Sequence, residues 1–165
     1  MNKLARWKAM SGNERRLWLT AWLLLPVVVL LLRWFGLRRT QATLLSIHRR
    51  GAKKAEEAQR LFERPLRNLC GERRFAEVVA QLISSAARHS LFAANCLPQS
   101  LVLWWMLRGE GIEVELRIGV RKERQTMEAH AWVELFGQVL NDRADVERRF
   151  APFEAAILPP EVRLP

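Results

Sequence analysis

The hydrophobic pattern of the chain is clearest in its C-terminal half. Residues 101–107 are apolar almost without interruption, which predicts a helix that is buried on most sides. Gly109 and Gly111 follow and are expected to end this helix. Apolar residues then alternate with polar or small ones over 113–121, the period of a half-buried strand. The pattern of this C-terminal half therefore predicts a buried helix followed by strands.

A second strand is predicted after a polar connection over residues 122–128. It alternates up to Leu135-Phe136-Gly137, where a three-residue hairpin turn with glycine last would reverse the chain. In that register His130 would face Asp142, with their Cβ atoms about 5 Å apart. A two-residue turn would instead place Ala131 opposite Asp142, a register that favours a His130–Asp142 pair less.

Three helical segments are predicted before this region. Residues 17–32 are apolar except for Thr20, and Pro26 is expected to kink them. Residues 40–64 form a second helix, with an interruption expected near Gly51. Residues 75–87 show apolar positions three and four apart, the pattern of an amphipathic helix. The preceding polar loop, 67–72, contains Cys70, which we interpret as a spectator.

The segment 17–32 has three interpretations. As a helix it would be about 24 Å long, shorter than the roughly 30 Å hydrocarbon core of a bilayer. Residues 34–37 extend the apolar stretch, and nearby tryptophans could anchor it at a membrane interface. The segment could insert into or lie on a membrane, form a helical hairpin packed on the rest of the protein, or bind a partner protein.

The net charge of +10 is confined to one part of the chain. Residues 1–66 hold 14 Lys and Arg against four Glu, whereas residues 67–165 hold 13 basic and 13 acidic residues. Basic residues beside an apolar run suit an anionic membrane surface better than a nucleic-acid groove, and no nucleic-acid-binding motif is present. We therefore expect a basic, helical N-terminal region, 1–66, and a second domain, 67–165.

Candidate chemistry lies where the buried helix begins. Asn95 or Cys96 can cap this helix, and Pro98 is tolerated in a first turn. The positive end of the helix dipole favours a thiolate at Cys96, as a nucleophile requires. With His130 as a base and Asp142 as its orienter, the three residues could form a Cys-His-Asp triad. A structural thiol and a hydrogen-bonded strand histidine are the simpler alternatives.

Other titratable residues have no comparable pattern. His48 and His89 lie in helical segments without a paired carboxylate, so no role is expected for them. Trp132 and Glu134 share the predicted face of His130, where they could line a cleft or simply pack and solvate the sheet. Zinc-ligand spacing, a phosphate-binding loop and a dinucleotide glycine motif are not found, and we expect no cofactor. Two cysteines in 165 residues suit a reduced, cytoplasmic setting better than a disulfide framework.

Three motifs resemble a known family. They are Cys-Leu-Pro-Gln-Ser-Leu at 96–101, Leu-Arg-Ile-Gly-Val-Arg at 116–121 and Ala-His-Ala-Trp-Val-Glu at 129–134. In this order they resemble the leader peptidases, or B proteins, of lasso-peptide biosynthesis, which are transglutaminase-like, papain-related cysteine hydrolases. The resemblance implies an α+β fold in which the nucleophile helix packs on a small antiparallel sheet.

The resemblance also implies an activity and partners. Cys96 would attack the bond between leader and core peptide, with His130 as general base and acid and Asp142 orienting it. The backbone N–H of Cys96 is a candidate oxyanion donor. Partners would be the lasso precursor peptide and an ATP-dependent, asparagine-synthetase-like cyclase, which would bring its own ATP. The setting would be cytoplasmic, with membrane association through residues 17–37 as an open alternative.

One feature departs from the longer members of that family. They carry an N-terminal winged-helix-like module that binds the leader, and residues 1–66 do not resemble one. The chain is similar instead to the split form, which implies a separate leader-binding protein. Two other functions remain open: an acyl transferase with the same triad, and a non-catalytic, membrane-associated scaffold.

Overall fold

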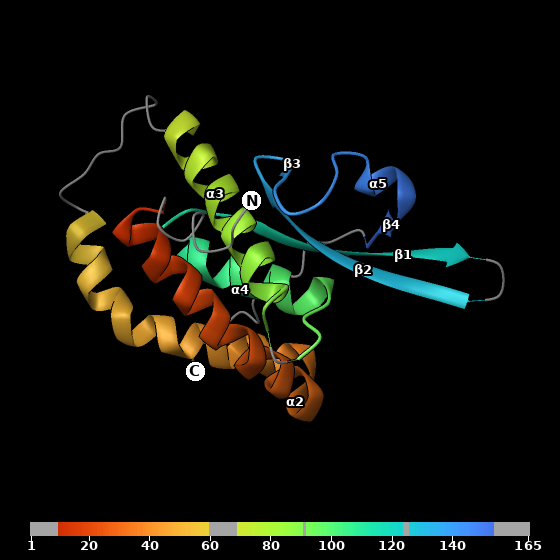
Figure 1. The fold of residues 1–165 in the computed structure, drawn as a ribbon, viewed down its shortest axis with the longest axis horizontal. Coiled ribbons are helices and arrows are strands. Elements are labelled where there is room, and N and C mark those ends of the chain that lie inside the picture. The colour runs from red at the N-terminus through yellow and green to blue at the C-terminus, as the bar shows by residue number, and fades with distance from the viewer. Residues whose placement is uncertain (1–9, 60–68, 91, 124–125, 154–165) are drawn as a thin grey trace, which may run out of the picture.

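The computed structural model describes residues 10–59, 69–90, 92–123 and 126–153. Side chains are described outside 45–59 and 69–70. The elements, in chain order, are α2 (Gly12–Gln59), α3 (Leu69–Ala87), α4 (Cys96–Gly109), β1 (Glu115–Glu123), β2 (Thr126–Leu135), β3 (Gln138–Val139), α5 (Val146–Arg149) and β4 (Ala151–Pro152). The strands form one antiparallel sheet in the order β3-β2-β1-β4. The α+β fold is therefore confirmed (Figure 1).

Helix α4 lies at the centre of the fold. It contacts α2 and α3 on one side and β1 and β2 on the other, so it separates the outer helices from the sheet (Figure 1). Its side chains at Leu101, Leu103, Trp104 and Leu107 are at most 1% exposed. The prediction of a helix that is buried on most sides is thus confirmed, and its apolar periodicity is weak because almost every face meets a neighbour.

Helix α2 combines two predicted helices into one long, bent element. The backbone leaves helical values at Gly36, where φ is 71° and ψ is 175°, and not at Pro26 as predicted. Glycine adopts a positive φ without a Cβ penalty, so the bend falls there. The helix continues through Gly51, so the interruption predicted at that position is wrong. Gly12–Leu44 is also long and apolar enough to cross a membrane, judged by length and composition alone.

One face of α2 packs on α3 and α4. Ala21, Leu25 and Val28 are fully buried in the same core as residues of α3 and α4. This packing places residues from both sides of the predicted boundary at residue 66 in one hydrophobic core. The boundary lies within 60–68, outside the described residues, and the division into 1–66 and 67–165 stays a prediction.

Helix α3 begins earlier than its apolar pattern predicts. It starts at Leu69, so the prediction of a polar loop over 67–72 is wrong from that residue onward. Cys70 is in its first turn, and the Cys70 side chain is outside the described residues. Glu72, also in the first turn, is suited to the positive end of the helix dipole.

Strands β1 and β2 extend into the connection that was predicted between them: β1 begins and ends two residues later than predicted, and β2 begins earlier. They pair from Glu115↔Glu134 to Glu123↔Thr126, so most of the polar connection expected at 122–128 is strand. Arg121 forms an ion pair with Glu128 at 2.7 Å across this end of the hairpin. Polar side chains occupy both faces there, which removed the alternation by which a strand is recognised.

The turn between β2 and β3 is also shorter than predicted. Leu135 pairs with Gln138 and Glu134 with Val139, so the loop has two residues, Phe136 and Gly137. Their φ angles are 52° and 71°, as expected for a type I′ turn, in which both central residues have positive φ. The predicted three-residue turn, with its His130–Asp142 register, is therefore wrong.

Candidate functional site

Cys96 is the first residue of α4, and its side chain is partly exposed. Asn95 occupies the N-cap position in an extended conformation, but its side chain makes no capping hydrogen bond. The first N–H groups of a helix have no intrahelical acceptor, so the start of α4 can offer donors to a negative charge. The thiol thus lies at a helix end that suits an anion.

A hydrogen-bond network joins α4 to β2 and to the segment after β3. The Ser100 hydroxyl, which is fully buried, donates to the carbonyl oxygen of Ala131 at 2.9 Å. The same oxygen of Ser100 accepts a hydrogen bond from the Asn141 side-chain amide, also at 2.9 Å. Asn141 in turn accepts from the N–H of Val133 at 2.8 Å. Cys96 is therefore one helical turn before Ser100, and Ser100 bonds to Ala131, the residue after His130 in β2.

His130 and Asp142 are joined by a hydrogen bond between Nε2 and Oδ2, despite the corrected hairpin register. The reason is that β3 ends at Val139, so the pairing rule for a regular ladder no longer applies at Asp142. The side chain of Asn141, rather than a strand carbonyl, accepts the Val133 N–H, and the chain bends there. The bond to Nε2 leaves Nδ1 of His130 free of this carboxylate.

The other oxygen of Asp142 is held by its own neighbours. Oδ1 accepts from the N–H of Arg143 at 2.6 Å and from Arg149 Nη2 at 2.8 Å. Burial by itself would raise the pKa of Asp142. The hydrogen bonds from Arg143, His130 and Arg149 outweigh burial and hold this pKa below its ordinary value. Asp142 is therefore kept as a carboxylate.

The imidazole of His130 is also enclosed by aromatic rings. Phe150 stacks on it with ring centroids 4.8 Å apart, and Trp132 lies 6.3 Å away. Arg121 covers the Phe150 ring at 4.8 Å. Together these contacts limit the rotation of the imidazole and leave its side chain 22% exposed.

Trp132 and Glu134 are packed inside the sheet region and do not line an open cleft. Trp132 is fully buried, and its indole N–H donates to Glu134 Oε1 at 2.6 Å. Glu134 is 4% exposed and forms an ion pair with Arg117 at 3.3 Å. Of the two alternatives for these residues, the structure supports packing.

The three predicted site residues are not all joined. The structure brings His130 and Asp142 together, but within the described residues Cys96 forms no hydrogen bond with His130. Catalytic hydrogen bonds are often long in a free enzyme and shorten when substrate binds. The catalytic roles of Cys96, His130 and Asp142 stay a prediction.

His89 has structural contacts that explain its position. Its Nδ1 lies 2.9 Å from the carbonyl oxygen of Ser85, and its ring meets the edge of Trp18. Its own carbonyl accepts from the Trp22 indole at 3.0 Å. His89 therefore ties α3 to α2, while the His48 side chain lies outside the described residues.

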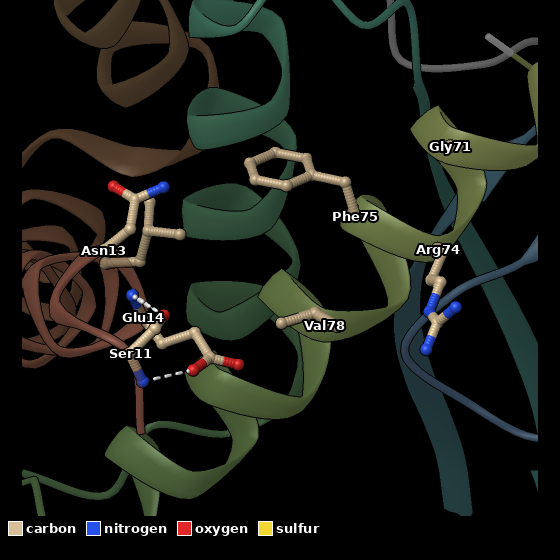
Figure 2. Close-up of a pocket in the computed structure, with 8 residues that line it drawn as sticks. Ser11, Asn13, Glu14, Gly71, Arg74, Phe75 and Val78 are labelled. Carbon is tan, nitrogen blue, oxygen red and sulfur yellow. Dashed lines mark hydrogen bonds between the residues drawn. The ribbon is translucent and has the colours of Figure 1, made fainter. Parts of the chain in front are cut away.

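A pocket of about 440 Å³ lies between the beginnings of α2 and α3 (Figure 2). Ser11 and Glu14 bond reciprocally at its edge, as a capping box does at the start of a helix. Figure 2 shows the Phe75 ring reaching from α3 toward the start of α2. Because its lining includes neither Cys96, His130 nor Asp142, the pocket is separate from the candidate site.

Four residues around the site were not assigned a role from the sequence: Ser100, Asn141, Arg149 and Phe150. Ser100 carried one signal, a hydroxyl in a helix expected to be buried, because a buried hydroxyl requires a partner. Asn141 and Arg149 look like ordinary surface residues in the sequence. Their contribution follows from contacts with Ser100 and Asp142 that no local pattern records.

The chain is similar to a known protein family along most of its length. The model of a family described as the transglutaminase-like superfamily matches residues 21–155. The microcin J25-processing protein McjB of Escherichia coli is 36% identical over 62 residues, which are 38% of this chain and 29% of that protein. The match thus spans less than a third of this relative's length. No solved structure matches the chain.

The family match agrees with the arrangement of the site elements. It begins within α2 and ends after β4, so it includes α4 with Cys96 and the strand that carries His130. The resemblance found in the three sequence motifs is therefore confirmed at the level of the family. The chain belongs to the transglutaminase-like superfamily.

Proposed function

We propose that this protein is a cysteine peptidase that removes the leader from a lasso-peptide precursor. The observation that carries the proposal is the hydrogen bond between His130 and Asp142, on a strand that Ser100 holds against the helix of Cys96. The likeness to McjB, which is named for processing the lasso peptide microcin J25, supports the substrate class.

The geometry supports a defined role for each residue. Asp142 would orient the imidazole through Nε2 and stabilise its protonated form. Nδ1 of His130 would then take the proton of the Cys96 thiol, and the thiolate would attack the carbonyl carbon of the scissile bond. The N–H groups at the start of α4 would stabilise the oxyanion.

The rest of the reaction follows by proton transfer. Protonated His130 would give its proton to the departing amine, which frees the N-terminus of the core peptide. Water, activated by the same imidazole, would then hydrolyse the thioester of Cys96. The net reaction adds one water to one peptide bond.

Two protein partners belong to the proposal. A separate protein would bind the leader, since residues 1–66 do not resemble the leader-binding module of longer relatives. An ATP-dependent, asparagine-synthetase-like cyclase would close the ring of the released core peptide. Because the precursor is made on ribosomes and the cyclase uses ATP, we place the reaction in the cytoplasm.

The proposal is tested by mass spectrometry of a precursor peptide incubated with the protein and the leader-binding partner. Wild type, Cys96→Ala and Cys70→Ala would be compared, the last as a matched control. We expect cleavage at one bond by wild type and Cys70→Ala and none by Cys96→Ala. Undiminished cleavage by Cys96→Ala would exclude the assigned nucleophile.

Membership in the transglutaminase-like superfamily supports a second candidate, transfer of the acyl group to an amine. The mass of the product distinguishes the two reactions, since hydrolysis adds water whereas transfer adds the amine and releases ammonia or the leaving peptide. A non-catalytic scaffold predicts neither product. It also predicts a Cys96 that is no more reactive toward an alkylating agent near neutral pH than an ordinary thiol.

A further inference from the structure

Helix α2 exposes a continuous apolar face. Six of its large apolar side chains are between 43% and 78% exposed: Leu19, Leu23, Val27, Leu30, Trp34 and Phe35. The first five follow one another at intervals of three or four residues, so they share one face of the helix. At 1.5 Å per residue this face is about 23 Å long. We call Leu19, Leu23, Val27, Leu30 and Trp34 the outer face of α2; Phe35 is exposed beside it.

The opposite face of the same helix is fixed to the protein. Ala21, Leu25 and Val28 are fully buried against α3 and α4. The Trp22 indole N–H donates to the carbonyl oxygen of His89 at 3.0 Å, which fastens the helix to the end of α3. If α2 spanned a membrane, it would have to leave these contacts and uncover the core. The outer face can therefore bind a surface along which α2 lies, while the opposite face stays packed on the protein.

The charged residues of α2 beside this face, from Arg15 to Arg39, are all basic. Arg16, Arg33, Arg38 and Arg39 are exposed along the helix. No Asp or Glu occurs in the sequence between Glu14 and Glu56. A second copy of the same face would bring arginines together and be repelled, whereas an anionic lipid surface offers apolar chains and negative headgroups at once.

We propose that the outer face of α2 docks the protein on an anionic membrane, with the helix parallel to the bilayer plane. Leu19, Leu23, Val27 and Leu30 enter the acyl boundary. Trp34 and Phe35, beside the bend at Gly36, lie at headgroup depth, as aromatic residues at membrane interfaces do. Helix α4 separates α2 from the sheet (Figure 1), and the docked face is opposite the face of α2 that packs on α4, so it points away from the strand that carries His130. This surface is independent of the peptidase proposal.

The test is sedimentation of the full-length protein with vesicles of phosphatidylcholine alone or mixed with phosphatidylglycerol. We expect binding to the anionic vesicles that weakens as salt screens the charges. Leu23→Glu with Val27→Glu should lower the partition coefficient by about tenfold or more, since both side chains lose their apolar burial. Met127→Glu with Phe136→Glu removes two apolar groups of the sheet region that are at least as exposed as Leu23 and Val27, and this variant should bind as wild type does.

A second variant keeps the test informative if the first does not fold. Arg33→Gln with Arg38→Gln leaves the apolar face intact and should weaken binding to anionic vesicles, while circular dichroism and thermal unfolding match the wild type. Failure of the wild type to bind anionic vesicles would overturn the proposal. So would a wild-type dimer that Leu23→Glu with Val27→Glu converts to monomer, since the face would then bind a second copy.

Discussion

Ser100 and Asn141 are 41 residues apart in the sequence and are joined by a hydrogen bond of 2.9 Å. Because Ser100 also donates to the Ala131 carbonyl, one buried hydroxyl connects α4, β2 and the segment that carries Asp142. Ser100 therefore connects the helix of the proposed nucleophile to the strand of His130 and to Asn141, the residue before Asp142.

Ser100→Ala should lower the free energy of unfolding by about 1–3 kcal/mol, because it leaves the Ala131 carbonyl and the Asn141 amide without their buried partner. It should also reduce the rate of precursor cleavage, since α4 and the Asp142 segment lose their shared anchor. Urea unfolding and a cleavage assay measure the two effects. Ser84→Ala, an identical change at an exposed site on α3, is the control. Equal stability of the two variants would contradict the assigned role of Ser100.

Asp142 should make the fold sensitive to acid in a defined pH window. Its pKa is lowered in the folded protein, so its contribution to stability is complete above the ordinary carboxyl pKa of 3.8 and is lost as the pH falls through the lower folded value. Asp142→Asn lacks this titration. We therefore expect wild type to be the more stable protein near pH 6 and the difference to shrink below about pH 4.

Urea unfolding of both proteins from pH 6 down to pH 3 measures this difference. Glu77→Gln, which removes an exposed ion pair with Arg73 on α3, serves as a control for the loss of one carboxylate. The difference in the free energy of unfolding between wild type and Asp142→Asn could instead stay constant through the acid range. That result would show that the contacts of Asp142 with His130, Arg143 and Arg149 do not favour the charged carboxylate.

Gly119→Ala should disturb the site through Trp132. A Cβ at Gly119 would be 2.9 Å from Trp132 Cη2 and 3.0 Å from the carbonyl oxygen of Ala151, closer than such atoms normally approach. The indole is fully buried and the oxygen belongs to the backbone of β4, so one of them must move. We expect a loss of about 1–3 kcal/mol in the free energy of unfolding.

Thermal or urea unfolding would measure this loss, and Gly71→Ala provides the comparison. Gly71 lies in α3 with no atom within 4 Å of an added Cβ, so alanine there should be neutral or stabilise the helix by up to about 1 kcal/mol. Equal stability of Gly119→Ala and wild type would mean that Trp132 and β4 have room that the structure does not show.

The elements of the site could be predicted from the sequence because their signals are local. The nearly continuous apolar run of α4, its cap and its terminal glycines identify a buried helix from neighbouring residues alone. The period-two alternation of β1 and β2 places His130 on a strand in the same way. Membership in the transglutaminase-like superfamily was also recognisable, since its motifs are short and contiguous.

Tertiary contacts decided the remainder. The local pattern predicts a three-residue turn that would pair His130 with Asp142, but the structure reaches that pair through a two-residue turn and an early end to β3. The path of the chain there depends on Asn141 reaching Ser100 and on Arg149 reaching Asp142, and periodicity cannot record such distant contacts.

Helix α2 shows the same limit for a different reason. Its sequence is apolar all round from 17 to 32, so no polar face indicates which side turns inward. Only its packing on α3 and α4 buries Ala21 and Val28 and leaves Leu23 exposed. Local pattern thus located the main helices and strands but not their ends. The choice of buried face and the assembly of the site required the folded chain, because both depend on contacts between residues far apart in the sequence.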